Sequence, residues 1–187
     1  MGQIATSEFS EERCVRPNPV LKSLLRANPL DTLVRLAVAE HYEVERTGVD
    51  DLHMLVPGFW CDHDLGFRFD REAERLTLTI LFEGRVVGGR SDEVFRLVGL
   101  LNENLPAGHF DFWVQSRALA YRQTLSLAGG AELRIEQAMA LIAEAMDAAE
   151  RGHPAFQYMI WAGDTPEAAI ERVREDMLVG TPLDDAG

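Results

Sequence analysis

Residues 75–84 read RLTLTILFEG, and apolar and polar side chains alternate along them. Leu76, Leu78 and Ile80 share one face of this segment, whereas Arg75 and Thr77 share the other. Because successive side chains of a β-strand point to opposite faces, the alternation predicts a strand with one buried face and one mostly polar face. This pattern is typical of a strand in an antiparallel sheet.

The preceding segment, residues 60–70, reads WCDHDLGFRFD and raises the question of a metal site or an active site. A thiol, an imidazole and two carboxylates occupy positions 61–64. Counting back by twos from Phe67 places Cys61 and His63 on the apolar face of a strand and both aspartates on the opposite face. A metal site needs three or four donors that converge on one point. The split therefore favours a sheet strand, unless a bulge at its start changes the register.

The rest of the sequence predicts helices and strands that come in runs instead of alternating. In chain order we expect a helix over 28–42, a hairpin of 42–47 and 52–56, the two strands above, a helix from 91, strands over 109–115 and 119–127, a long helix over 134–152, and a last helix over 166–178. This order, α-β-β-β(-β)-α-β-β-α-α, predicts an α+β fold in which helices flank an antiparallel sheet of five to six strands.

Capping residues and prolines mark the expected helix ends. Caps are expected at Asn28, at Ser91, and at Asp164 or Thr165. The pair His153-Pro154 predicts the boundary at which the long helix ends. One face of that helix is expected to carry Ile135, Ala138, Met139, Ile142, Ala145, Met146 and Ala149.

Length and charge limit the classes of protein that this chain can belong to. Its 187 residues suit a single domain, which we expect over 28–178 between a flexible arm at 1–27 and a frayed tail at 179–187. The net charge of −13 argues against nucleic acid or an anionic membrane as partner, because both need a positive face. No secretory signal is evident, and Cys14 and Cys61 suggest no disulfide framework, so we expect a cytoplasmic protein.

The sequence offers little support for any other catalytic or nucleotide-binding motif. His109 and Asp111 share one face of a predicted strand and could form half of a catalytic dyad, but no nucleophile stands in a recognisable elbow. The glycine pairs match neither a dinucleotide fingerprint nor a P-loop. We therefore predict no catalytic, cofactor-binding or metal-binding residue. The alternative is a small-molecule or metal-dependent sensor or enzyme that uses Cys61, His63 and the His109-Asp111 pair.

An apolar run near the C-terminus, residues 155–163, reads AFQYMIWAG and predicts a surface that binds another chain. It holds more large side chains than one face of a short helix can bury, and aromatic and Met side chains are enriched in interface cores. We expect a homodimer, and the residues predicted to form its interface are Phe156, Met159, Ile160 and Trp161, with Phe112 and Trp113 as weaker candidates.

Four strings together resemble the YbjN family of bacterial sensory transduction regulators, in the form found in alphaproteobacteria. They are NPLDTLVRLA at 28–37, LLNENLPAGHFDFW at 100–113, LSLAGGAEL at 125–133 and HPAFQYMIWAGDTPEAAI at 153–170. The resemblance covers roughly residues 28–175 and implies a fold similar to that of type III secretion chaperones, which usually self-associate and bind extended segments of other proteins. It brings no catalytic motif. It therefore implies a non-enzymatic regulatory or chaperone-like protein-binding module, homodimeric, in bacterial signalling or stress regulation.

Overall fold

The computed structural model describes residues 27–82, 84, 86 and 89–180. Almost all of the expected N-terminal arm, and the part of the expected tail after residue 180, lie outside these residues. The elements in chain order are α2 (Pro29–Glu40), β1 (Glu43–Glu45), β2 (Asp51–Val56), β3 (His63–Asp70), β4 (Arg75–Leu81), α3 (Ser91–Asn102), β5 (His109–Trp113), β6 (Ala118–Ser126), η1 (Ala128–Gly130), α4 (Ile135–Gln157), η2 (Tyr158–Ala162) and α5 (Pro166–Gly180). The expected order of helices and strands is confirmed.

The strands form one six-stranded sheet in the order β1-β2-β3-β4-β6-β5, and every neighbouring pair is antiparallel. The register between the central strands sets Phe67 opposite Leu78 and Leu65 opposite Ile80. These apolar pairs lie on the same face of the sheet, so the alternation seen in residues 75–84 becomes a continuous buried layer. The expected α+β class with an antiparallel sheet is confirmed.

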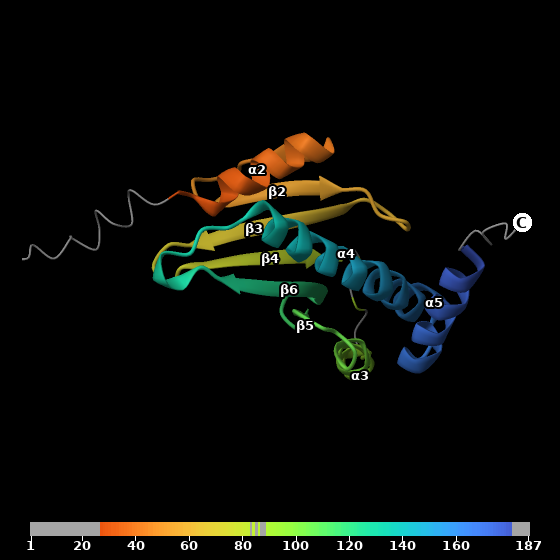
Figure 1. Cartoon of the computed structure of the whole chain (residues 1–187). Helices are drawn as coiled ribbons and strands as arrows, with labels where there is room; N and C mark the ends of the chain where they lie inside the picture. The colour runs from red at the N-terminus through yellow and green to blue at the C-terminus, as the bar shows by residue number, and fades with distance from the viewer. Residues whose placement is uncertain (1–26, 83, 85, 87–88, 181–187) are drawn as a thin grey trace, which may run out of the picture.

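One face of the sheet is covered and the other is left to solvent. Helices α2 and α4 lie across the covered face, and α3 and α5 lie towards one end of the sheet (Figure 1). Along β3 the buried positions are His63, Leu65, Phe67 and Phe69, and they alternate with exposed or half-exposed ones. Asp64 and Arg68 are among the exposed residues. The predicted division of His63 from Asp64 by face is therefore confirmed, although β3 begins only at His63 and Cys61 precedes it in a loop.

Two of the three expected helix caps are confirmed. The Asn28 side-chain oxygen accepts a hydrogen bond from the Leu30 N–H at 3.0 Å. The Thr165 hydroxyl accepts one from the Ala168 N–H at 3.3 Å. The cap predicted at Ser91 is wrong by one position, because Ser91 is already the first residue of α3 and the residue before it makes no side-chain capping bond.

The boundary predicted at His153-Pro154 is wrong, because α4 runs through Pro154 to Gln157 and continues into the π-helical turn η2. A proline inside a helix leaves the carbonyl four residues earlier without its usual N–H donor. That carbonyl belongs to Glu150, and it accepts a hydrogen bond from the Trp60 indole nitrogen at 3.1 Å. A donor from a distant loop thus replaces the bond that Pro154 removes, and the helix continues.

The inward face of α4 also differs from the prediction. Ile135 and Met139 are exposed, whereas Leu141 and Ala148 are buried. The buried residues between positions 135 and 150 are Ala138, Leu141, Ile142, Ala145, Ala148 and Ala149. The small side chains in this stripe let α4 lie close to the sheet, and the larger Met139 is left on the outside.

Candidate functional site

The structure divides the predicted interface residues between the core and the surface. Phe156, Met159 and Phe112 are buried within the chain itself, and Ile160 and Trp113 are partly buried. Trp161 is 77 % exposed. Of the predicted set, Trp161 therefore offers the largest accessible side chain to a second molecule, and self-association through it remains a prediction.

The predicted His109-Asp111 pair does not form a dyad. The Asp111 carboxylate accepts a hydrogen bond from the Trp113 indole nitrogen at 3.2 Å and lies 3.7 Å from Arg122 Nη1. Within the described ranges, the Cys, His and acidic side chains close enough to hold one metal ion are Cys61, His63 and His153. The structure thus joins two members of the alternative site to a histidine of α4 and leaves His109 and Asp111 elsewhere.

These three side chains, here called the Cys61 cluster, come from the loop before β3, from the first residue of β3 and from α4. Their potential ligand atoms all lie within 4.8 Å of one another. Cys61 Sγ is 4.0 Å from His63 Nδ1 and 3.9 Å from each of the two ring nitrogens of His153. Such a set of one thiol and two imidazoles could hold a transition-metal ion.

Glu150, one helical turn before His153, anchors the loop that carries Cys61. One of its carboxylate oxygens, Oε1, accepts a hydrogen bond from the Phe59 N–H at 3.0 Å and lies 3.3 Å from His63 Nε2. The distance of 3.3 Å between His63 Nε2 and Glu150 Oε1 is that of an ion pair, but the two atoms do not form a hydrogen bond. His63 Nε2 has no hydrogen-bond partner in the described part of the chain. Glu150 Oε2 is buried and also has none there.

Close packing at Gly58 holds this arrangement together. A Cβ atom added at Gly58 would lie 2.2 Å from Glu150 Oε1 and 2.5 Å from the Cys61 carbonyl oxygen. No side chain fits there, so the loop can approach α4 this closely only with glycine at position 58. Sequence reasoning missed Glu150 and His153. Their spacing of three residues was the available signal, because a helix that continues past position 152 places both on one face.

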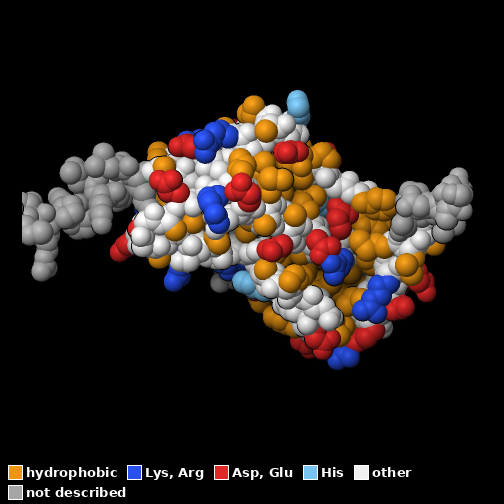
Figure 2. Space-filling model, in the orientation of Figure 1, with side chains coloured by type: hydrophobic (Ala, Val, Ile, Leu, Met, Phe, Trp, Pro, Cys, Tyr) orange, Lys and Arg blue, Asp and Glu red, His pale blue; other side chains and the backbone are white. Residues whose placement is uncertain are grey.

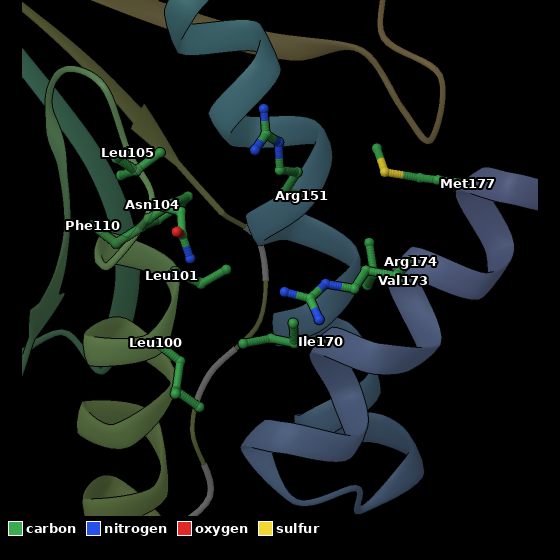
Figure 3. Close-up of a pocket in the computed structure, with 10 residues that line it drawn as sticks. All are labelled: Leu100, Leu101, Asn104, Leu105, Phe110, Arg151, Ile170, Val173, Arg174 and Met177. Carbon is green, nitrogen blue, oxygen red and sulfur yellow. The ribbon is translucent and has the colours of Figure 1, made fainter.

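The second candidate site is a groove between α3 and α5, called here the α3–α5 groove (Figure 3). It is lined by Leu100, Leu101, Asn104, Leu105, Phe110, Arg151, Ile170, Val173, Arg174 and Met177. Figure 3 shows leucines from α3 and the turn after it on one side and α5 side chains on the other. Its cavity volume of about 120 Å³ is well below the roughly 300–1,000 Å³ typical of small-molecule pockets. The groove therefore suits a few apolar side chains of a larger partner better than a whole metabolite.

Two charged side chains, Arg151 and Arg174, belong to the lining of the groove, and each is paired with an acidic residue. Arg151 forms an ion pair with Asp147, and Arg174 Nη1 lies 3.3 Å from Glu171 Oε2. In the space-filling view, hydrophobic side chains reach the surface over the ends of α4 and α5, among acidic and basic ones (Figure 2). This apolar centre with a polar rim is the composition of a protein-binding surface.

Arg90, just before α3, connects the two walls of the groove. It donates hydrogen bonds to the Met159 carbonyl and, at 2.9 Å, to the Asp164 carbonyl, and it forms an ion pair with Glu93. The hydrogen bond and charge of Arg90 lower the pKa of Glu93. Arg90 therefore fixes the start of α3 to the segment between α4 and α5.

A hydrogen bond between Tyr158 and Asp176 holds α5 against η2. The Tyr158 hydroxyl donates to Asp176 Oδ2 at 2.5 Å, and the Arg172 guanidinium lies 4.3 Å from the centre of the Tyr158 ring. The hydrogen bond to Asp176, together with burial, raises the pKa of the Tyr158 hydroxyl, so the bond keeps its proton at neutral pH.

Fold and surface together define an α+β protein that presents an apolar groove between helices and has no predicted catalytic constellation. A sequence model of the YbjN family, described as "Putative bacterial sensory transduction regulator", matches residues 29–158. The match covers more than half of the chain, and the protein belongs to the YbjN family.

Solved structures similar to the chain include YbjN from E. coli and the ExsC–ExsE complex. The crystal structure of YbjN from E. coli has a TM-score of 0.47 and 12 % sequence identity, over 79 % of this chain and 93 % of that one. The ExsC–ExsE complex gives a TM-score of 0.45 and 17 % identity, over 67 % of this chain and 92 % of the matched one. At these TM-scores neither likeness supports a residue-by-residue correspondence. No curated protein sequence matches the chain.

Among the described residues, no helix has both the length and the apolar character needed to cross a membrane.

Proposed function

We propose that this chain is a non-enzymatic, cytoplasmic regulatory module that binds another protein in its α3–α5 groove. Membership of a family described as regulatory supports the regulatory role. The observation that carries the binding role is the groove itself, with apolar side chains such as Leu101, Ile170 and Met177 facing one another between two helices. Its occupant is proposed to be an amphipathic helix, whose apolar face lies against such a wall and whose polar face stays in water.

Charge predicts the character of that helix. The chain has a net charge of −13, and the two arginines at the groove are already paired with acidic neighbours. Acidic side chains along the walls that take part in no ion pair among those described, Asp92, Glu103 and Glu175, leave the surroundings negative. The partner helix is therefore expected to carry basic residues beside its apolar face, and its association should slow as salt screens the attraction.

Two neighbouring positions on α5 provide the test of the groove. Met177 lines the groove, whereas Leu178 is exposed and does not line it. Met177→Glu places a carboxylate against the apolar wall, so the affinity for a partner purified from the native organism should fall at least about tenfold, measured by calorimetry. Leu178→Glu adds the same charge one residue away and should leave the affinity nearly unchanged.

The same proposal predicts the effect of a substitution in α3, on the opposite side of the groove. Leu100→Glu in α3 should weaken the same partner as strongly as Met177→Glu does, because both side chains line the groove. A partner that binds both variants and the unaltered chain with equal affinity must use another surface. That result would contradict the proposal that the α3–α5 groove is the binding site.

We also propose that the chain forms a homodimer through the surface around Trp161. An indole that is 77 % exposed gains by burial against a second copy, and tryptophan is among the side chains most enriched in interface cores. Light scattering at micromolar concentration should give about twice the chain mass of 20.9 kDa, and Trp161→Asp should give the mass of one chain. A monomeric mass for both the unaltered chain and the variant would contradict the homodimer proposal. It would not affect the proposal that the groove binds another protein.

A further inference from the structure

The Cys61 cluster is not used by the proposed protein-binding function, although it is built from buried and tightly placed groups. His63 has 4 % of its surface exposed, and Cys61 and His153 are partly buried beside it. The His63 and His153 ring centres are 5.7 Å apart, and the Phe82 ring lies 5.9 Å from that of His153. The three potential ligands thus stand at the edge of the hydrophobic core, where an ion would be shielded from bulk water.

The spacing of the ligand atoms is close to that of a tetrahedral metal site. Zinc binds thiolate sulfur at about 2.3 Å and imidazole nitrogen at about 2.0 Å, which puts a sulfur and a nitrogen roughly 3.5 Å apart in a tetrahedron. Cys61 Sγ is 4.0 Å from His63 Nδ1 and 3.9 Å from His153. A side-chain movement of about 0.5 Å would bring the sulfur to ligand distance from each histidine, and all the potential ligand atoms already lie within 4.8 Å of one another.

The second nitrogen of His63 provides an independent indication. His63 Nδ1 faces Cys61, while Nε2 lies 3.3 Å from Glu150 Oε1 and makes no hydrogen bond in the described residues. A metal-bound histidine characteristically donates its other N–H to a carboxylate, which fixes its tautomer and orientation. A metal at Nδ1 would place the remaining proton on Nε2, 3.3 Å from Glu150 Oε1, and a small rotation of the Glu150 side chain would then let the carboxylate accept it.

We propose that Cys61 Sγ, His63 Nδ1 and one nitrogen of His153 bind a single zinc-type divalent ion, with Glu150 as the positioning residue for His63. Three protein ligands leave a fourth position, which water or an external ligand would take. The ion would join the loop over residues 57–62 to α4 beside Pro154. It would therefore reinforce the same contact that the Trp60 indole makes with the Glu150 carbonyl.

Cobalt provides a direct test, because a thiolate bound to Co²⁺ gives a charge-transfer absorption band that oxygen and nitrogen ligands do not. The full chain, without a polyhistidine tag and kept reduced, is stripped with a chelator and titrated with Co²⁺ and then with Zn²⁺. We expect the band to saturate at one Co²⁺ per chain and to disappear as Zn²⁺ displaces it. Zinc should also raise the midpoint of thermal unfolding, because the ion binds the folded chain.

Four variants separate this site from incidental binding. Cys61→Ser should abolish the band, and His153→Ala should abolish binding at one equivalent. Glu150→Gln should keep the band but weaken binding by about 10- to 100-fold, since it alters only the positioning of His63. His109→Ala, on the far edge strand, should change nothing. A folded chain that binds no Co²⁺ or Zn²⁺, or a band that survives Cys61→Ser, would overturn the proposal.

Discussion

Phe156→Ala is expected to lower the free energy of unfolding by about 3–5 kcal/mol, a large share of the roughly 5–15 kcal/mol available to a typical domain. Phe156 is completely buried at the end of α4. Its ring lies beneath the loop at Gly84, where an added Cβ would come within 3.4 Å of it. Truncation removes a whole aromatic ring from a region that side chains fill, and the cavity it leaves adds to the lost burial. Urea denaturation followed by circular dichroism measures the change.

Trp161→Ala is the matched control, because it removes an even larger ring five residues along the chain. Trp161 is 77 % exposed, so its loss should change the stability of a single folded chain by less than about 0.5 kcal/mol. Both variants should be compared over a range of protein concentrations, since a dimer would add a concentration-dependent part to the stability. Equal effects of the two substitutions would contradict the burial of Phe156.

Gly152→Ala is expected to destabilise the protein by about 2 kcal/mol, although alanine is the better helix former. A Cβ at position 152 would lie 2.3 Å from Phe110 Cε1 and 2.4 Å from Phe110 Cζ. The Phe110 ring cannot move aside, because Phe82 and Tyr121 pack against it with ring centres 5.8 and 5.5 Å away. The overlap therefore pushes α4 away from β5, and this cost exceeds the gain of about 1 kcal/mol in helix propensity.

Gly99→Ala is expected to have the opposite effect on stability to Gly152→Ala. Gly99 lies inside α3, and an added Cβ there would meet nothing within 4 Å. The substitution should stabilise the chain by up to about 1 kcal/mol through helix propensity and a less flexible unfolded state. Opposite signs for two glycine-to-alanine changes in helices would confirm that contact with Phe110 decides the result at position 152. Stabilisation at both positions would contradict the close approach of α4 to β5.

The candidate sites were only partly predictable from the sequence. The face assignment of His63 followed from the period of two residues in a strand, and the structure confirms it. Its partner His153 lies 92 positions away from Cys61. No local pattern relates residues at such a separation, because their meeting depends on how α4 crosses the sheet. The local spacing of Glu150 and His153 could have indicated a shared helix face, but not what that face would meet.

The end of the long helix α4 could not be predicted from local sequence either. Pro154 favours a helix end on local grounds, since a proline inside a helix leaves a carbonyl without its donor. The Trp60 indole supplies that donor to the Glu150 carbonyl from a loop 90 residues earlier in the chain. Local preference was overridden by one tertiary hydrogen bond, and the helix continues into η2.

By itself, the sequence determined the class of fold, the family, the order of the elements and the side of each central strand that is buried. These features follow from periodicity and capping, which the backbone geometry of a single element imposes over a few residues. Only the tertiary structure decided that Phe156 lies inside while Trp161 lies outside, that α3 and α5 form a groove, and that Cys61 meets His153. These outcomes depend on how separate elements pack, because burial is shared between segments that are distant in the chain and close in space.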